Sequence, residues 1–398
     1  MRIAFVINTS WNIFNFRMSL VRALQAEGHE VLAIAPPDDY SARLVEAGCR
    51  FVPLPMANKG TRPDQDFGLM RRLAKIYRQE RPDVVLHYTI KPNIYGTLAA
   101  RLAGVPCINN VSGLGTVFIV RNFVSRIALA LYRLAFRFPA TVFFQNPDDR
   151  DLFLEHHLLK PEICGLLPGS GVDTARFRPA PTWQRGQPFT LLMIARVLYE
   201  KGIVEYFEAA RAIKATYGDR VRCLLLGGLD EQGGIGVPRA TFEGWLQDGA
   251  VEWLGTSDDV AAVIQTADCV VLPSYREGTP KTLLEAAAMG KPLVTTDVPG
   301  CREVVVEGEN GFLCPARDGG ALGVALNRVV ALSDAELRRM GAASRELAVR
   351  RFDQQVVIDR YLDAISRATD RPSRRAAGLP VAIAPPRGTA VTAPPPAA

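Results

Sequence analysis

The sequence has few cysteines, and their spacing excludes two kinds of site. The seven cysteines are odd in number, widely scattered and never arranged as CxxC. Neither a disulfide framework nor a zinc site is therefore indicated. We expect these thiols to be reduced and mostly buried.

Long apolar runs are also missing. No run reaches the roughly 18 residues that a membrane span requires, and the opening MRIAFVIN resembles a strand rather than a signal peptide. The chain also lacks a basic patch interleaved with aromatic residues, which argues against a nucleic-acid partner. The sequence therefore predicts a cytoplasmic protein.

Positive charge is concentrated in the first half of the chain. Residues 1–180 contain 22 Lys and Arg against 15 Asp and Glu, whereas the remainder contains 25 against 26. We therefore expect any large anionic partner, such as a phospholipid surface, to meet the N-terminal half.

Apolar runs alternate with helix-period stretches twice along the chain. RIAFVIN, DVVLHY and TVFFQN belong to the first half, and FTLLMIA, VRCLLLG and CVVLPS to the second. This alternation is typical of doubly wound parallel sheets, and 398 residues with 48% hydrophobic content suffice for two cores. The sequence predicts an α/β protein with two Rossmann-like domains, 1–184 and 185–368, and a disordered Pro/Ala-rich tail, 369–398. The final helix of the second domain is a candidate to pack back on the first.

A strand, a loop and a helix start surround the segment EGTPKTLLE, residues 277–285. Pro280 suits the first position of a helix, so Glu277 is expected on the loop and Glu285 on the second helical turn. The helical rise between Pro280 and Glu285 is roughly 7.5 Å, comparable to the span of a diphosphate. In isolation such a pair is more often one glutamate complementing the helix dipole and one solvated glutamate.

A second strand-loop-helix unit, LLMIARVLYEKG, supplies two cations. Arg196 follows the strand and Lys201 lies at a helix start, where it opposes the helix dipole. A planar guanidinium and a point charge together can bind a diphosphate without a metal. The two units together favour a site for an anionic ligand.

Several motifs resemble a known family in order and spacing. ARVLYEKG, VEWLGTSDDV, LPSYREGTPKTLLEAAAMGKPLVTTDVPGCREVV and ENGFL resemble the retaining GT-B glycosyltransferases of family 4, also called glycosyl transferases group 1. INNVSGLGTVF and LLPGSGVDTARFRP resemble the subgroup that extends polyprenyl-diphosphate-linked sugars, in particular enzymes that add α-1,3-linked N-acetylgalactosamine to undecaprenyl-diphosphate-bound diacetylbacillosamine. The resemblance implies transfer from a UDP-sugar to a lipid-linked sugar acceptor, with no metal and no cofactor.

The resemblance also implies roles for individual residues. Arg196 and Lys201 would bind the donor diphosphate, Glu277 would contact the donor sugar, and Glu285 would hold the ribose hydroxyls. Gly278, Thr279 and Pro280 would bring backbone close to sugar and phosphate. The nucleobase would lie against Gly227, Gly228, Leu254 and Thr256.

Acceptor contacts are expected from loops of the first half. The segment NTSWNIFNFR lacks the glycines that many relatives carry there, and contributes Asn12 and Arg17. His87 follows a strand, where it is a candidate base, although local packing of a single histidine is the stronger alternative. The other acceptor-side candidates are Lys91, Gly113 and Gly115.

The stretch SRIALALYRLAFRF is unusually apolar for a helix with three arginines. Arg126, Arg133 and Arg137 form a narrow stripe, and Ile127, Leu131, Leu134 and Phe138 line an apolar face. Such a helix is either well packed in the protein or partly inserted in a membrane interface. The second alternative predicts peripheral attachment to the anionic inner face of the cell membrane.

Three rival functions stay open. A nucleotide-sugar epimerase can share the two-domain fold, a partner protein can bind such ligands without catalysis, and a transferase can use a soluble acceptor. The acidic pairs in PDDRD, 147–151, and SDDV, 257–260, are interpreted as helix caps rather than as metal ligands.

Overall fold

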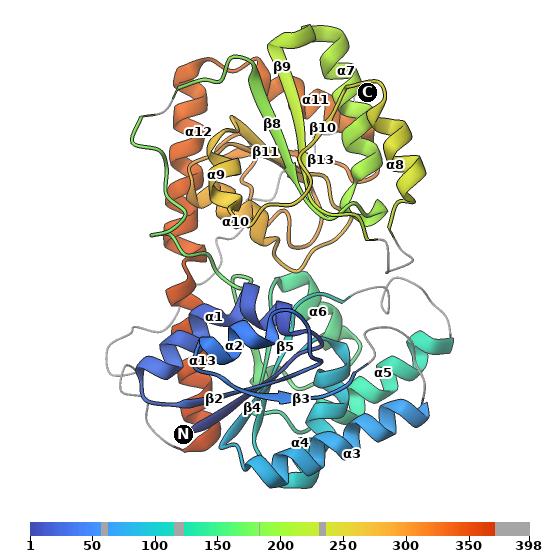
Figure 1. Ribbon diagram of the computed structural model, residues 1–398, viewed down its shortest axis with the longest axis vertical. Helices are drawn as coiled ribbons and strands as arrows, with labels where there is room; N and C mark the ends of the chain where they lie inside the picture. Colours follow the sequence, from blue (N-terminus) through green and yellow to red (C-terminus); the bar gives the residue numbers. More distant parts are fainter. Residues whose placement is uncertain (57–62, 115–122, 183, 231–235, 371–398) are drawn as a thin grey trace, which may run out of the picture.

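Two parallel sheets, each with helices, form the two halves of the molecule (Figure 1). The computed structural model describes residues 1–56, 63–114, 123–182, 184–230 and 236–370. The doubly wound α/β arrangement predicted from the alternating pattern is confirmed. The predicted tail from residue 371 onward lies outside the described residues.

The N-terminal half is built on a seven-stranded parallel sheet with the order β3-β2-β1-β4-β5-β6-β7. Its strands are β1 Arg2–Val6, β2 Glu30–Ala35, β3 Arg50–Pro53, β4 Val84–Tyr88, β5 Cys107–Val111, β6 Thr141–Phe144 and β7 Cys164–Leu166. Its helices are α1 Ser10–Ala26, α2 Ser41–Glu46, α3 Pro63–Glu80, α4 Thr97–Ala103, α5 Phe123–Ala135 and α6 Pro147–Glu155, with a π-helical turn at Pro92–Gly96. Strands β1, β2, β4, β5 and β6 are buried over nearly their whole length, which explains their continuous apolar sequences.

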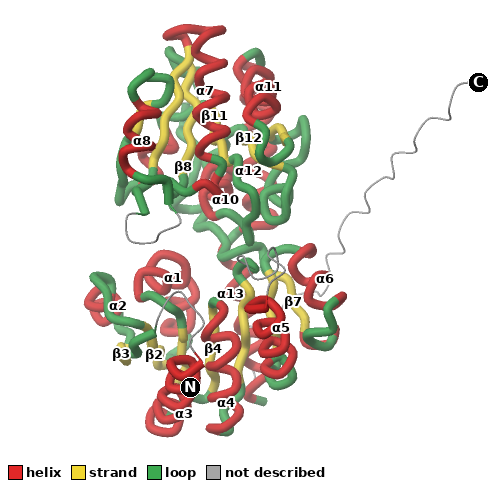
Figure 2. The backbone as a smooth tube through the Cα atoms, turned by 90° about the vertical axis from the view of Figure 1, so that its right-hand side faces the viewer, coloured by secondary structure: helices red, strands yellow, loops and turns green. Residues whose placement is uncertain are grey.

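The C-terminal half contains a six-stranded parallel sheet with the order β10-β9-β8-β11-β12-β13. Its strands are β8 Phe189–Ile194, β9 Val221–Leu226, β10 Glu252–Trp253, β11 Cys269–Leu272, β12 Leu293–Thr296 and β13 Gly311–Cys314. Its helices are α7 Ile203–Tyr217, α8 Arg239–Leu246, α9 Val260–Gln265, α10 Lys281–Ala288, α11 Gly319–Val330 and α12 Asp334–Leu347. In each half the strands lie between helices (Figure 2).

The last described helix, α13 Gln354–Thr369, returns to the N-terminal half. Val357, Ile358, Leu362 and Ile365 belong to the same buried cluster as residues of β1, β2 and β4. Tyr361 accepts a hydrogen bond from Asn110 Nδ2 of β5 at 2.9 Å. The chain therefore crosses between the halves twice. The domain boundary near Arg185 stays a prediction.

Both sheets reverse their strand order at one point, and the two points face the same space. In the N-terminal sheet the reversal lies between β1 and β4, and in the C-terminal sheet between β8 and β11. Ligands of open parallel sheets bind beyond the carboxyl ends of the strands at such points. Segments following β1, β8 and β11 all contribute to the pocket described next.

Candidate active site

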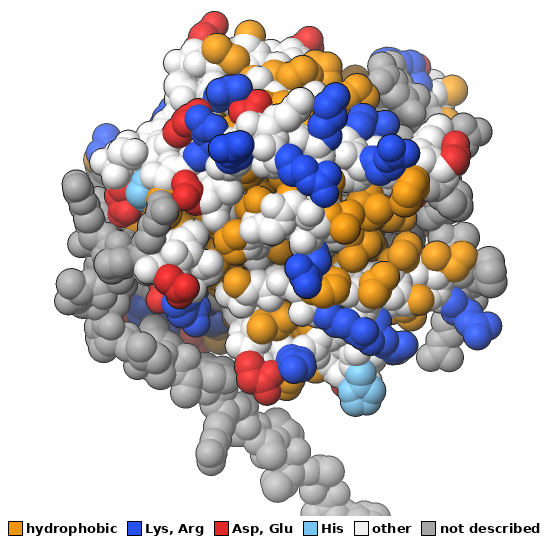
Figure 3. Space-filling model, turned by 90° about the horizontal axis from the view of Figure 1, so that it is seen from below, with side chains coloured by type: hydrophobic (Ala, Val, Ile, Leu, Met, Phe, Trp, Pro, Cys, Tyr) orange, Lys and Arg blue, Asp and Glu red, His pale blue; other side chains and the backbone are white. Residues whose placement is uncertain are grey.

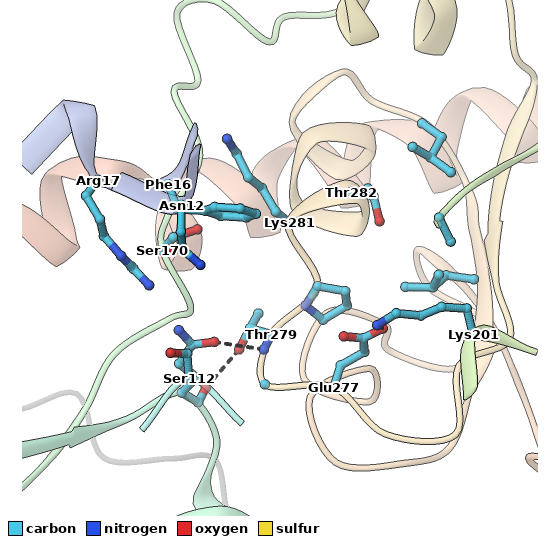
Figure 4. Close-up of a pocket in the computed structure, with 16 residues that line it drawn as sticks. Asn12, Phe16, Arg17, Ser112, Ser170, Lys201, Glu277, Thr279, Lys281 and Thr282 are labelled. Atoms are coloured by element: carbon cyan, nitrogen blue, oxygen red, sulfur yellow. Dashed lines mark hydrogen bonds and ion pairs between the residues drawn. The ribbon is translucent and has the colours of Figure 1, made fainter. Parts of the chain in front are cut away.

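A pocket between the two halves is lined by residues from both (Figure 4). The N-terminal half contributes α1 and the loops that follow β5, β6 and β7, and the C-terminal half contributes the ends of β8 and β11 and the start of α10. The lining residues are Asn12, Phe16, Arg17, Ser112, Gln145, Ser170, Ile194, Ala195, Lys201, Leu272, Glu277, Gly278, Thr279, Pro280, Lys281 and Thr282.

Lys201 and Glu277 form an ion pair on the C-terminal wall of this pocket. Lys201 Nζ donates to Glu277 Oε1 at 2.6 Å, and the Ser274 hydroxyl donates to the same oxygen at 2.6 Å. Both charged side chains keep part of their surface exposed, 18% and 15% respectively. The two residues come from different strand-loop-helix units, so parallel pairing of β8 with β11 brings them together. An ammonium and a carboxylate thus lie in contact beyond the carboxyl ends of β8 and β11.

Helix α10 starts at the pocket, but its predicted donor residue Glu285 is not among the residues that line the pocket. Glu285 is buried, and its carboxylate lies 3.5 Å from Lys281 Nζ. Burial raises the pKa of Glu285, while the nearby Lys281 ammonium opposes the rise. Lys281 Nζ also donates to the backbone oxygen of Asn15 at 2.6 Å, which connects α10 to α1 of the other half.

A turn of the N-terminal half holds the loop that carries Glu277. Asn146 Nδ2 donates to the Gly278 oxygen at 2.8 Å, and the Thr279 hydroxyl donates to the Gln145 oxygen at 2.9 Å. Asp149, whose side chain is fully buried, pairs with the guanidinium of Arg276. Burial raises the pKa of Asp149, partly opposed by Arg276. The loop geometry therefore depends on contacts between the two halves.

Arg17 enters the pocket from α1, on the side away from Lys201 (Figure 4). It is only 5% exposed, and its guanidinium lies 4.3 Å from the centre of the Tyr88 ring. Helix α1 begins directly after β1, and the Thr9 hydroxyl caps it by accepting from the Asn12 backbone N–H. The cap fixes the start of the helix that presents Asn12 and Arg17.

Other predicted donor residues lie outside the lining of this pocket. Arg196 follows β8 but its side chain is exposed to solvent. Gly227 and Leu254 follow β9 and β10, and the Gly227 N–H donates to the Gly255 oxygen at 2.7 Å. Gly228 adjoins Thr256. These four predicted nucleobase contacts form one group at the carboxyl ends of two neighbouring strands.

The acceptor-side candidates separate in the structure. Asn12 and Arg17 line the pocket, and a Cβ on Gly113 would lie 3.8 Å from the Gly278 nitrogen. Gly115 lies outside the described residues. Lys91 pairs with Asp66 at 2.8 Å and is not part of the pocket lining.

His87 is not available for acceptor contact in this structure. Its side chain is fully buried, where Tyr77 Oη and Asn109 Oδ1 lie 2.9 and 3.0 Å from its two ring nitrogens. Burial lowers the pKa of His87 to about 4, so the ring is neutral at physiological pH. The packing alternative describes this residue, because His87 lies within β4 rather than beyond its end and its side chain points into the core.

Several lining residues were not predicted from the sequence. They are Phe16, Ser112, Gln145, Ser170, Ile194, Ala195, Leu272, Lys281 and Thr282. The segment PDDRD was interpreted as a helix cap, but the residue that caps α6 is Asn146, which accepts from the Asp149 N–H, and Asp148 and Asp149 lie in the first helical turn. The ion pair from Asp149 to Arg276 was missed, because no local pattern relates residues 127 positions apart. Asp259 caps α9, as predicted for SDDV.

Helix α5 buries one face and exposes another. Ala128, Tyr132 and Ala135 are buried, whereas Ile127 and Leu134 are 44% and 45% exposed. The predicted arginine stripe, Arg126, Arg133 and Arg137, is exposed. Figure 3 shows apolar side chains gathered beside Lys and Arg on the lower end of the N-terminal half. Among the described residues, every helix is too short or too polar to cross a bilayer.

The fold and the pocket together define a class of protein. Two Rossmann-like sheets face each other across a pocket that carries three cations, the carboxylate of Glu277 and a helix start at the strand ends. This is the GT-B architecture of enzymes that bind a nucleotide-sugar and an acceptor between two domains.

Comparison with known families identifies the chain more closely. A model of the glycosyl transferases group 1 matches residues 177–347, and a model of the glycosyl transferase 4-like domain matches residues 15–169. The chain belongs to this glycosyltransferase family, and the predicted family is thereby confirmed.

Individual relatives are similar over most of the chain. The N,N'-diacetylbacillosaminyl-diphospho-undecaprenol α-1,3-N-acetylgalactosaminyltransferase of Campylobacter jejuni is 29% identical over 92% of this chain and 99% of its own length. The UDP-Gal:α-D-GlcNAc-diphosphoundecaprenol α-1,3-galactosyltransferase of Escherichia coli is 25% identical over 75% and 79%. The structure of Anabaena HepE in complex with UDP and glucose has the same fold, with a TM-score of 0.75, 17% identity and coverage of 92% and 99%.

Proposed function

We propose that this glycosyltransferase moves a sugar, N-acetylgalactosamine or another hexose or hexosamine, from a UDP-sugar to a polyprenyl-diphosphate-linked saccharide. The observation that carries the proposal is the Lys201–Glu277 pair, which lies at the ends of β8 and β11 and faces the N-terminal half. The acceptor class rests on the names of two relatives that cover most of the chain. Such a reaction belongs to the assembly of cell-surface or protein-linked glycans.

The donor occupies the C-terminal wall in this proposal. Lys201 and Arg196 bind its diphosphate, and the free N–H groups at the start of α10 add positive potential. Glu285 accepts the ribose hydroxyls, and the group formed by Gly227, Gly228, Leu254 and Thr256 holds the base. Lys201 exchanges its present carboxylate partner for phosphate oxygens, and this leaves Glu277 free to accept a hydroxyl of the donor sugar.

The chemical step breaks the bond between the anomeric carbon and the phosphate oxygen. Negative charge develops on the departing diphosphate, where Lys201 and Arg196 stabilise it as donors stabilise an oxyanion. An acceptor hydroxyl attacks from the same face, and the leaving phosphate takes its proton, so the configuration is retained. The protein cations perform the charge stabilisation without a metal ion.

A lipid-linked acceptor places the N-terminal half at a membrane surface. The exposed Ile127 and Leu134 of α5, and Phe138 just after this helix, supply apolar contact, and the neighbouring arginines attract anionic headgroups. The exposed Phe67 of α3 and Leu102 of α4 extend the apolar surface. We place the enzyme at the cytoplasmic face of the cell membrane as a peripheral protein.

The test of the reaction combines donors with and without acceptor. Purified protein is incubated with UDP-N-acetylgalactosamine, UDP-galactose, UDP-N-acetylglucosamine or UDP-glucose, with and without a polyprenyl-diphosphate sugar, and products are identified by mass and anomeric NMR. Transfer to the lipid-linked sugar with retention, unchanged by EDTA and lost in Glu277→Gln, is the expected result. The exposed Glu252→Gln serves as matched control. Conversion of the donor without acceptor would identify an epimerase, and transfer only to a free sugar would identify a soluble acceptor.

The membrane contact has its own test. Sedimentation with liposomes containing anionic lipid is compared between the wild type and a variant with Arg126, Arg133 and Arg137 changed to glutamate. A variant with the same change at Arg220, Arg339 and Arg350 of the C-terminal half controls for net charge. Loss of binding in the first variant alone is expected, and equal binding by all three proteins would exclude α5 as the contact.

A further inference from the structure

Arg17 carries a buried positive charge without an acidic partner. The residue is 5% exposed, and within the described part of the chain it forms no ion pair and no hydrogen bond. Its Nε atom is itself buried and unpartnered. Buried charges in proteins are ordinarily paired, because desolvation of an unpaired ion is costly.

The neighbours of Arg17 compensate little of this charge. The guanidinium lies over the ring of Tyr88, which is fully buried and whose pKa burial raises well above its ordinary value. The ring is therefore neutral, and a cation–π contact offsets only part of the desolvation cost.

The other cations of the pocket differ from Arg17 in this respect. Lys201 pairs with Glu277 at 2.6 Å, and Lys281 lies 3.5 Å from Glu285. Each lysine thus has a carboxylate from the protein. Arg17, on the N-terminal wall, lines the same pocket and has no carboxylate partner among the described residues.

A second unpartnered atom lies on the same helix. Asn12 Oδ1 is buried without a hydrogen-bond partner, one helical turn or so from Arg17, and Asn12 also lines the pocket. This oxygen can only accept a hydrogen bond, so it suits a hydroxyl group. A guanidinium beside a hydroxyl acceptor matches a sugar attached to a phosphate group.

We propose that Arg17 binds the diphosphate of the lipid-linked acceptor and that Asn12 accepts a hydroxyl of the adjoining sugar. The planar guanidinium can donate two parallel hydrogen bonds to phosphate oxygens. Arg17 lies on the opposite side of the pocket from Lys201, which serves the donor diphosphate in the proposed function (Figure 4). The inference rests on that proposed function for the identity of the acceptor.

Steady-state kinetics distinguish the two diphosphates. In Arg17→Gln, the KM for the polyprenyl-diphosphate sugar is expected to rise by about 10–100-fold, the range of a charged hydrogen bond. The KM for the UDP-sugar is expected to change less than about twofold, since its contacts are on the other wall. With a neutral alkyl glycoside of the same sugar as acceptor, wild type and variant should be equal. Arg17→Lys should recover part of the loss, and the exposed Arg22→Gln of the same helix is the matched control.

A binding measurement keeps the inference testable without turnover. Farnesyl diphosphate should raise the Tm of the wild type and not that of Arg17→Gln, whereas farnesol should affect neither and UDP should stabilise both. If the wild type transfers no sugar, the proposed function fails while this measurement still decides the role of Arg17.

Three results would overturn the inference. One is a raised KM for the UDP-sugar, or lost stabilisation by UDP, with the acceptor KM unchanged, because Arg17 would then serve the donor. Another is a similar loss with the neutral glycoside together with a lowered Tm, which indicates a structural role. The third is equal stabilisation of wild type and Arg17→Gln by farnesyl diphosphate.

Discussion

The two walls of the pocket treat their charges differently. On the C-terminal wall, Lys201 and Lys281 each lie near a glutamate of the same half. On the N-terminal wall, Arg17 is buried against a neutral ring. A cation that is paired with a carboxylate must leave that carboxylate to bind a ligand. An unpaired cation can bind an anion without losing an ion pair. The C-terminal wall is thus organised before any ligand binds, and in our proposal an anionic ligand completes the N-terminal wall.

The largest effect is expected from removing Lys201, the cation that pairs with Glu277 on the C-terminal wall. Lys201→Ala should lower kcat by about 10²–10³-fold, because no protein ammonium then stabilises the departing phosphate. Transfer rates at saturating substrates measure this. Lys214→Ala, on α7 of the same half with its Nζ bonded to the Gly249 oxygen, should retain wild-type activity. An active Lys201→Ala would mean that the paired lysine is structural and that the contrast between the walls has no catalytic meaning.

A methyl group added at Gly278, where the two walls of the pocket meet, should disturb the geometry of both walls. A Cβ on Gly278 would lie too close to the Ser112 oxygen and Gln145 Oε1 for ordinary contact. Gly278→Ala must therefore shift the loop that carries Glu277 away from the N-terminal half. Activity should fall about 10–100-fold, in keeping with small misplacements of reacting groups. UDP binding, measured by calorimetry, should change much less. Gly244→Ala of α8, where the added Cβ meets open space, is the control. Wild-type kinetics in Gly278→Ala would show that the loop position does not matter.

The free energy of unfolding should depend on the ion pair between Asp149 and Arg276, which joins the two halves. Asp149→Ala leaves the partly buried Arg276 without its carboxylate, which should lower the free energy of unfolding by about 2–3 kcal/mol after allowance for the exposed part of Arg276. Urea unfolding measures the change. The exposed Asp151→Ala on the same helix should cost less than about 0.5 kcal/mol. Equal stability of the two variants would place the connection between the halves elsewhere.

The smallest effect concerns the buried carboxyl group of Glu285, on α10 of the C-terminal half. Because burial raises the pKa of Glu285, the folded protein holds this proton to higher pH than the unfolded chain does. The contribution of Glu285 to stability is therefore present at low pH and is lost as pH rises through the raised pKa. Glu285→Gln lacks this titration, so its free energy of unfolding should increase relative to the wild type as the pH rises above the ordinary pKa of a glutamate. A difference independent of pH would mean that the carboxyl group titrates normally.

The sequence predicted the C-terminal wall better than the N-terminal one, for a physical reason. Glu277 and Lys201 each lie within a short strand-loop-helix unit, so local pattern alone places them at the carboxyl end of a sheet. Gln145 and Ser112 line the pocket because the two halves meet there, and that contact leaves no local periodicity. His87 was expected to follow a strand in the same way, but it lies within β4 and is buried against Tyr77 and Asn109. Side-chain direction at a strand end depends on packing that the sequence does not display.

Helix α5 illustrates the same limit. Periodicity identified an apolar face with Ile127, Leu131, Leu134 and Phe138, but it could not say which apolar residues the fold would cover. The structure buries Tyr132 and Phe136 and exposes Ile127 and Leu134. Packing, one of the two alternatives predicted from the sequence, thus describes one side of the helix, and membrane contact is our proposal for the other side.

The return of α13 has a consequence for how the protein is made. The N-terminal core includes Val357, Tyr361 and Ile365, and the Asn110–Tyr361 hydrogen bond spans 251 residues. On the ribosome, the first half therefore emerges long before the helix that completes it. Its hydrophobic surface stays open while the entire second half is synthesised, so the two halves finish folding in the reverse of the order in which they appear.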